Sequence, residues 1–570
     1  MKKLKLHLSI FLLLLVCIQV YAQQKRTVDF IGGARSFMTN NRINVRDSVP
    51  DTTTIKRNTG GYALIDLGVK IKPNSNTEIL GMFRINNSYG GFWGSGVSFD
   101  VRQLWLKGII GNTVRYQLGD LNLKQTPFTL YNHHADNIDS LPTIFNLQNQ
   151  IISYEKFYTK NTWRQQGANV DFGLQFSKIL KEINFTGYIT RLQATNFTTI
   201  PDRLMGGGTV NIVQSKHLNF GYNNFSVFDV KGTVLDSNQY TNYVHTVDAG
   251  YTTNIKNNIL EIRAEAGKSI SEYSQDSTSR LKDYFVNAFA KFSIPKQHLE
   301  FVLGYLNVGP DFRSIGAQSK NINYNSVLNY YNRYSNAQIA RPVGLMDVIN
   351  NANLYTTSVS SSLLPANPIY NNVLPYGIAT FNRIGAYLKV NYVSPSGVSI
   401  RAEHYNLSEI RGQGTFKLKK FMLTKLIAQI EINKLAHFER ALKIQLGANM
   451  QSTNRTSNVE VEKVDLKNLQ WNAGIEYEVF SKIDILLGYV AINTKGNDFI
   501  PDRNMSSKVV YFTNTKFNLM QQVAGAGARY RFSDKIYLCA MYQEAQFKDA
   551  LKQSPNYNLK QFALIYNMTF

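Results

Sequence analysis

The last fourteen residues, YNLKQFALIYNMTF (557–570), place apolar side chains on every second position up to the final residue. The positions of this set are Phe562, Leu564, Tyr566, Met568 and Phe570. A period of two indicates a β-strand whose two faces meet different environments. The apolar face must lie against a protein core or against lipid, and the rest of the chain decides between these two.

The same alternation recurs along the whole chain. Clear examples are residues 63–71, 260–266, 398–403, 426–432, 442–449 and 524–532. We find no segment with a sustained period of 3.6 residues, so the sequence predicts a nearly all-β protein. Segments that fit the alternation number 22 between Arg26 and Phe570, within a range of 16 to 22, and the assignment is weakest at 205–232.

The connections between these segments differ in length. Short runs rich in Asn, Gly, Pro and Ser, typical of hairpin turns, occur at 73–76, 111–112, 256–257, 295–297, 394–397 and 533–534. Long polar loops follow the alternate strands, and the longest span about 121–167 and 309–376. This pattern is typical of a single antiparallel transmembrane β-barrel with an even strand count, short periplasmic turns and long extracellular loops.

A soluble β-sandwich, propeller or β-helix would also show alternation. Charged residues in the middle of strands, such as Arg263 and Arg401, argue against a sandwich, because its core would not tolerate them. A closed barrel also satisfies every backbone group in lipid and has no open edge. We therefore expect the apolar face to contact lipid.

The N-terminus predicts export. Lys2, Lys3 and Lys5 precede an apolar stretch from Leu8 to Val20, and Ala22 ends a pattern suited to cleavage. The stretch is too short for a membrane-spanning helix, which needs about 20 apolar residues. We therefore assign residues 1–22 to a signal peptide and 23–570 to the mature barrel.

Charge and cysteine content limit the partners. The chain carries a net charge of +23, and loss of the leader leaves 59 basic against 39 acidic residues, a net charge of +20. A basic exported protein is better suited to anionic lipopolysaccharide, glycans or solutes than to nucleic acid. Cys539 is the one cysteine beyond the leader, so the mature chain has no internal disulfide.

Together, the leader, the repeated hairpins and the terminal strand resemble Gram-negative outer-membrane β-barrel proteins, and the richness in Asn, Lys and Tyr is similar to those of the Bacteroidota. The strand ending in Phe570 resembles the signal that the barrel-assembly machinery recognises. The resemblance implies localisation in the cell outer membrane. It also implies contact with the lipid bilayer and lipopolysaccharide, and with the assembly machinery during insertion.

If the apolar positions face lipid, the other parity lines the lumen, where charged residues mark a pathway or pair with one another. The candidate pore-lining residues are Arg84, Arg102, Arg115, Glu261, Arg263, Glu265, Arg383, Arg401, Glu403, Lys425, Arg529 and Arg531. On this parity we count 11 cations and nine anions, which predicts at most a weak preference for anions. The same residues could equally form ion-pair ladders that stiffen the wall.

We therefore expect a porin-like channel for passive diffusion of small hydrophilic solutes, anionic or sugar-like. One or both long loops would fold inward, and loop 309–376 offers Arg333 and Arg341 for contact with solutes. The alternative is a non-conducting barrel that serves as a subunit or scaffold of a larger secretion or assembly complex, with partner proteins docking on the long loops.

Signals for catalysis, cofactors or metals are weak. The sequence contains no catalytic or phosphate-binding motif, so we expect neither an enzyme nor a cofactor. His133, His134, Asp136 and Asp139 lie together in YNHHADNID (131–139). Adjacent side chains point apart, so we interpret this stretch as a solvated loop rather than a metal site.

Overall fold

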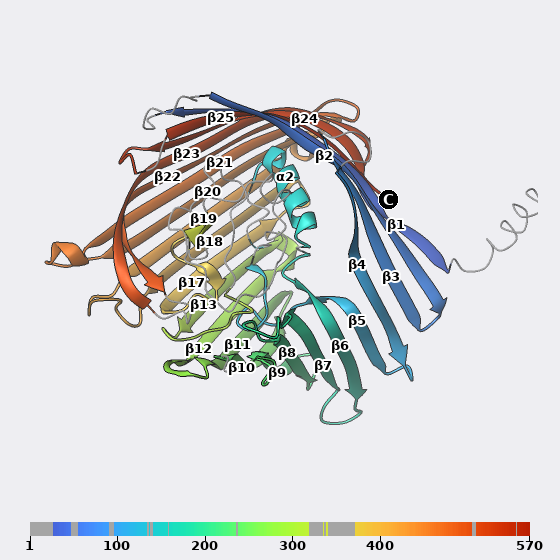
Figure 1. Cartoon of the computed structure of the whole chain (residues 1–570), viewed down its shortest axis with the longest axis vertical. Coiled ribbons are helices and arrows are strands. Elements are labelled where there is room, and N and C mark those ends of the chain that lie inside the picture. The colour runs from blue at the N-terminus through green and yellow to red at the C-terminus, as the bar shows by residue number, and fades with distance from the viewer. Residues whose placement is uncertain are drawn as a thin grey trace, which may run out of the picture.

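The structure is a computed structural model. It describes residues 27–46, 55–89, 96–133, 136, 141–157, 159–234, 238–318, 334–335, 338–339, 371–503, 509–553 and 556–570. Its main feature is one antiparallel sheet of 22 strands (Figure 1). The predicted signal peptide lies outside the described residues.

The first half of the sheet consists of β1 (Val28–Arg46), β2 (Ile55–Asn74), β3 (Thr77–Ser88), β4 (Val97–Ile110), β5 (Val114–Leu123), β6 (Trp163–Gln175), β7 (Glu182–Gln193), β8 (Arg203–Val213), β9 (Leu218–Asp229), β10 (Tyr240–Ile255) and β11 (Asn258–Tyr273). The second half consists of β12 (Asp276–Ile294), β13 (Leu299–Val308), β17 (Arg383–Val393), β18 (Val398–Ser408), β19 (Lys420–Glu431), β20 (Leu442–Arg455), β21 (Val464–Phe480), β22 (Ile483–Arg503), β23 (Val509–Ser533), β24 (Ile536–Asp549) and β25 (Asn556–Thr569).

Other elements lie in the connections. They are the short strands β14 (Tyr334–Ser335), β15 (Gln338–Ile339) and β16 (Pro375–Ile378), the helices α2 (Thr143–Glu155) and α5 (Ile432–Ala436), and the 3₁₀ turns η2 (Pro295–Gln297) and η3 (Glu460–Glu462). Within the described ranges, no helix is long and apolar enough to cross a membrane.

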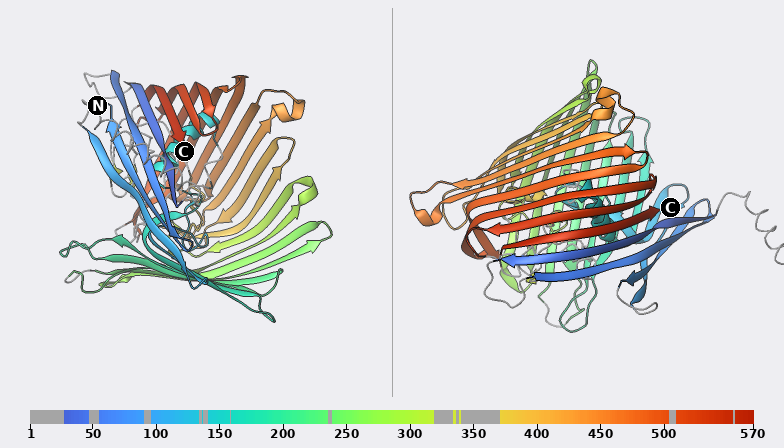
Figure 2. Two further views of the ribbon diagram at one scale, coloured as in Figure 1. Left: turned by 90° about the vertical axis from the view of Figure 1, so that its right-hand side faces the viewer. Right: turned by 90° about the horizontal axis from the view of Figure 1, so that it is seen from above.

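The sheet closes on itself. Each strand pairs with its neighbour in sequence, β13 pairs with β17, and β1 pairs with β25. The terminal residue takes part in this closure, because Phe570 N donates to Gly32 O over 3.0 Å and Gly32 N donates to Phe570 O over 3.1 Å. The prediction of a closed antiparallel barrel with 22 strands is confirmed. The first strand begins at Val28, and the predicted start at Arg26 lies outside the described residues. Figure 2 shows the sheet curving around the interior from two further sides.

The two faces of the wall differ as the terminal strand predicted. Phe562 of β25 and Phe570, directly after it, are 45% and 43% exposed on the outer face, whereas Ala563 and Ile565 on the opposite parity are fully buried. An apolar side chain exposed on every second residue of a closed barrel gives the barrel an apolar outer surface.

Most short connections lie at one end of the barrel, which we call the short-turn end. All six predicted turns join paired strands there, as at 256–257 between β10 and β11. The contrast between the two ends is not uniform. Residues 274–275 form an equally short turn at the other end, and residues 432–441, which include α5, form a longer connection at the short-turn end.

The described parts of both long connections lie in the interior. Residues 124–133 and 141–157 from the first and 309–318 and 371–382 from the second are here called the inner segments, and Figure 1 shows α2 enclosed by the strands. The aromatic ring of Phe128 stacks on that of Phe285 with ring centroids 3.9 Å apart. The two inner loops also bond to each other, since Tyr131 N donates to Gly316 O over 3.0 Å.

Helix α2 was not predicted. Ile144, Phe145, Ile151 and Ile152 are all buried on one side of it. Their spacing follows the helical period of 3.6 residues, so the expectation of no helical period is wrong for this part of the predicted long polar loop.

Candidate functional site

The start of α2 docks against three glycines on adjacent strands. Gly474, Gly488 and Gly525 lie side by side on β21, β22 and β23, because Gly474 pairs with Gly488 and Gly488 with Gly525. We call this set the glycine row. A Cβ added at Gly488 would lie 2.5 Å from Ile144 Cγ2 and 2.7 Å from Phe145 Cε2. The missing side chains therefore create the space into which α2 fits.

A polar contact fixes the same end of the helix. Thr143 Oγ1 donates to Glu476 Oε2 over 3.0 Å. Glu476 is also paired with Arg529, whose Nε donates to Asp484 Oδ2 over 2.8 Å. Arg531 joins this network through Asp484. The ion pairs between these strands thus orient the carboxylate that receives α2.

The other end of α2 lies in a cluster of arginines. Glu155, which is 2% exposed, contacts Arg35 of β1, Arg84 of β3 and Arg102 of β4, and we call these three arginines the arginine cage. Arg84 Nη1 lies 2.6 Å from Glu155 Oε2, and Arg102 Nη1 lies 3.5 Å from the same oxygen. Arg35 Nη2 donates to Glu155 Oε1.

The wall contributes one further carboxylate to this cluster. Arg84 binds Asp66 with two hydrogen bonds of 2.7 Å, in the forked geometry that guanidinium groups form with carboxylates. Tyr154 donates its hydroxyl to Asp66 and accepts a hydrogen bond from Arg102 Nη2 on its carbonyl oxygen, over 2.6 Å. The cluster therefore holds three cations and two anions.

An irregularity in β4 helps to position Arg102. Met82 of β3 pairs with Gln103 and Phe83 pairs with Val101, so Arg102 has no partner on β3. A bulge of this kind inserts one residue and changes the direction of its side chain. Arg102 is consequently buried, and its guanidinium carbon lies 4.1 Å from the ring centroid of Phe157, just beyond α2.

The cage sets the ionisation of the helix end. Burial acts to raise the pKa of Glu155, but the charges of Arg35, Arg102 and Arg84 outweigh it and lower that pKa to about 2. Burial lowers the pKa of the neighbouring Lys156 to about 8. The charged form of Glu155 is thus held firmly in the cage at neutral pH.

The other candidate pore-lining residues occupy several different settings. Arg383 is buried and holds an inner segment, donating from Nε to Val373 O over 2.9 Å. Glu261 pairs with Arg263 over 2.6 Å and with Lys291 over 2.8 Å, as an ion-pair ladder would.

Further candidates lie elsewhere along the wall. Glu403 stands between Lys389 and Lys425 in the register of β17, β18 and β19. Arg115 pairs with Asp171. Arg401 is exposed opposite Asn391.

Glu265 is half-buried opposite Asn287. The wall brings Arg84 and Arg102 together at one point and Arg529 and Arg531 at another. The remaining candidates are spread around the barrel, and their role in lining a pore stays a prediction.

Parts of the predicted loop features lie outside the described residues, among them His134, Asp139, Arg333 and Arg341. Of the histidine cluster, His133 is buried and its Nδ1 lies 3.2 Å from Asp136 Oδ2. Within the described part of the chain, no group of three or more His, Cys, Asp or Glu side chains is arranged to hold a metal ion.

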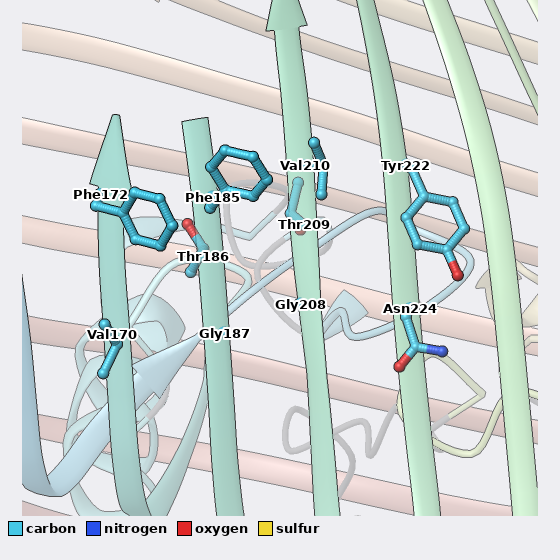
Figure 3. A pocket seen from close by; sticks show the side chains of 10 residues that line it. All are labelled: Val170, Phe172, Phe185, Thr186, Gly187, Gly208, Thr209, Val210, Tyr222 and Asn224. Atoms are coloured by element: carbon cyan, nitrogen blue, oxygen red, sulfur yellow. The ribbon is translucent and has the colours of Figure 1, made fainter. Parts of the chain in front are cut away.

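A depression of about 320 Å³ lies on β6 to β9 and shares no residue with the arginine cage (Figure 3). Phe172 and Phe185 stack along it with ring centroids 4.9 Å apart, and Gly187 and Gly208 leave its middle open. Tyr188 and Phe225, on the opposite parity, are buried in the interior. The depression therefore belongs to the apolar outer surface and contains none of the candidate pore-lining residues.

No family model and no curated protein matches the sequence. Distant similarity to solved barrels exists. A BenF-like porin from Pseudomonas fluorescens Pf-5 is 8% identical, with a TM-score of 0.35 over 95% of this chain and 99% of that chain. The FrpB iron transporter from Neisseria meningitidis, in its apoprotein form, is 9% identical, with a TM-score of 0.44 over 95% of this chain and 81% of that chain.

The usher PapC translocation pore is 7% identical, with a TM-score of 0.34 over 94% of this chain and 100% of that chain. Similarity at this level is too low to transfer a function to this chain. The fold and the site themselves define a closed 22-strand β-barrel with loops packed inside it.

Several residues of this site were not predicted from the sequence. Arg35, Glu155 and the glycine row were not singled out, whereas Arg84 and Arg102 were. One signal in the sequence does point to a filled interior. Leu64 and Ile565 are apolar on the inward parity, and both belong to the buried cluster around α2. An apolar residue on the polar parity of a barrel strand indicates an apolar contact inside.

Proposed function

We propose that this chain is an outer-membrane channel for small hydrophilic solutes, with a lumen that the inner segments occlude at rest. One observation carries the proposal: a closed barrel with an apolar outer face has polar side chains on its inner wall that bind the inner segments of two long connections. Asn242 Nδ2 donates to Arg313 O over 3.0 Å, and Gln451 Oε1 accepts from Asn372 N over 2.9 Å. Barrels of 22 strands are wide enough to need such internal filling.

The same features support an outer-membrane location. A closed barrel satisfies its backbone hydrogen bonds in lipid, and the exposed apolar positions of β25 suit that environment. We propose the lipid bilayer and lipopolysaccharide as the surroundings of the mature protein. We further propose that the strand ending in Phe570 is the segment that the barrel-assembly machinery recognises.

Transport in this proposal is passive, and the charges of the lumen select the solute. The test is single-channel conductance of the refolded protein in a planar bilayer, with a salt gradient across it to give the ion preference. The proposal expects a small resting conductance with a weak preference for anions. It also expects a several-fold larger conductance once α2 is released from the wall.

The filled interior also favours a second candidate, a non-conducting barrel that serves as scaffold in a larger envelope complex. Buried apolar clusters surround both inner loops, as the core of a rigid scaffold would require. If the barrel is a scaffold, neither the wild type nor any folded variant with α2 released should show conductance in the bilayer. That result, with folding checked by heat-dependent gel mobility, would reject the channel.

A further inference from the structure

We propose that the arginine cage is a binding site for small organic carboxylates, and that Glu155 occupies it as a resident carboxylate which an incoming solute displaces. This inference rests on the channel function proposed above. It assigns that channel a class of solute and a way of opening.

The charge of the wall supports a site for anions. Arg35, Arg84 and Arg102 place three guanidinium groups around Glu155, and among the described wall residues Asp66 is the carboxylate that pairs with two of them, so these four wall residues together carry a charge of +2. Glu155 reduces this charge to +1. Buried charges are costly unless they are paired, so the cage favours an anion with more charge than Glu155 brings.

The hydrogen bonding of the cage is also incomplete, because two of its guanidinium nitrogens lack a good acceptor. Arg35 is 4% exposed, and its Nε has no hydrogen-bond acceptor within the described part of the chain. Arg102 Nε lies 3.5 Å from Asp66 Oδ2, longer than a good hydrogen bond. Buried donors without acceptors are rare in folded proteins. A dicarboxylate would bring two carboxylate groups where Glu155 brings one.

Only the last turn of α2 has to move for this exchange. The cage contacts Tyr154, Glu155 and Phe157, all at the C-terminal end of the helix. The opposite end stays docked on the glycine row through Ile144 and Phe145. Displacement of Glu155 therefore releases one turn from the wall without dissolving the apolar contacts of the whole helix.

Lys156 reports on this release. Its side chain is 3% exposed between Glu155 and Phe157, so an acylating reagent cannot reach it while the turn is in place. The experiment measures the rate of Lys156 acetylation by peptide mass spectrometry in the full-length refolded protein. The probes are succinate, inorganic phosphate and uncharged erythritol, at equal osmolarity and ionic strength.

The inference predicts that succinate accelerates acetylation of Lys156 and that erythritol does not. Glu155→Gln should be acetylated about tenfold faster than wild type without any solute, because losing one partner of a buried ion pair shifts an opening equilibrium by that factor or more. Gln150→Ala, an exposed change on the same helix, should behave as wild type. The succinate measurement on wild type holds even if a variant does not fold.

An unchanged or slower rate of Lys156 acetylation at saturating succinate would overturn the inference. An equal effect of phosphate would overturn the assignment to carboxylates. The labelling needs no membrane, so its result is separate from the conductance test of the proposed function. If the barrel conducts but succinate does not accelerate Lys156 acetylation, this inference alone is rejected. If the barrel shows no conductance, the proposed channel function is rejected.

Discussion

The docking of α2 on the glycine row can be tested by adding two methyl groups to the inner wall. In the double variant Gly474→Ala and Gly488→Ala, the new Cβ atoms would lie 2.6 Å from Pro142 Cβ and 2.5 Å from Ile144 Cγ2. Ordinary van der Waals contact lies at 3.4–4 Å. The helix must therefore move away from the wall by about 1 Å to accept both methyl groups.

The energetic effect follows from this overlap. Overpacking a well-filled site costs about 1–3 kcal/mol for each added group, so the pair should weaken docking by about 2–6 kcal/mol. The lower figure already changes the ratio of docked to released helix about thirtyfold. The backbone of Pro142 leaves little room for relaxation, since its Cα lies 3.1 Å from the Cβ added at Gly474.

Single-channel conductance in planar bilayers measures the consequence. The double variant should open more often, or to a larger conductance, than wild type under identical salt and voltage. Gly187→Ala is the matched control, because it adds a methyl group to a strand glycine with no atom within 4 Å of the new Cβ. A double variant that folds and conducts as the control does would refute the docking of α2 on the glycine row.

Three further predictions concern the cage, the ladders and the terminus. The lowered pKa of Glu155 means that its ion pairs stabilise the docked turn fully above about pH 4.5, and that this stabilisation is lost as pH falls towards about 2. Conductance should therefore rise across that interval in wild type and stay flat in Glu155→Gln. Arg84→Met should lower the free energy of unfolding by about 3–5 kcal/mol in urea titrations, because Arg84 is part of a buried ion-pair cluster. Arg263→Met, at a side chain 48% exposed, should lower it by under about 1 kcal/mol. Equal losses would contradict the claim that the cage is buried. Deletion of Phe570 removes both its hydrogen bonds to Gly32 and an exposed aromatic ring, and should reduce the yield of assembled barrel in vivo; an unchanged yield would reject its role in assembly.

The barrel could be predicted from the sequence because its signal is local. Alternation at positions such as 557–570 and 63–71 depends only on which face of a strand meets the apolar surroundings. Turn chemistry at 256–257 and 394–397 then fixes where paired strands meet. Both features are present in short windows, so the strand count and the closure followed from the sequence.

The interior could not be predicted in the same way, because it depends on register. The glycine row joins residues 474, 488 and 525, which become neighbours only through the pairing of three strands. Glu155 looks like an ordinary acidic residue in a loop until β1, β3 and β4 bring their arginines around it. The bulge at Arg102 is likewise a property of the β3–β4 pairing rather than of β4 alone.

The sequence of α2 does contain a pattern that indicates a helix. Its buried residues Ile144, Phe145, Ile151 and Ile152 recur at helical spacing, directly after Pro142, a residue common at helix starts. The long loop around it concealed this signal, since a loop of that length was expected to be irregular. Inward-facing apolar residues such as Leu64 complete the pattern.

A reversible disulfide between α2 and the wall tests the central claim that this helix occludes the barrel. Ile144 Cγ2 lies 2.5 Å from a Cβ placed at Gly488, so cysteines at these two positions are within reach of a disulfide. Cys539 is fully buried and is replaced by alanine to avoid exchange. We predict that the oxidised Ile144→Cys, Gly488→Cys barrel stays closed in the planar bilayer. Reduction should increase its conductance several-fold, because the side chain added at position 488 then crowds Phe145 and weakens docking, as the added methyl group of Gly488→Ala does. Failure of the disulfide to form, or equal conductance before and after reduction, would contradict the occluded channel.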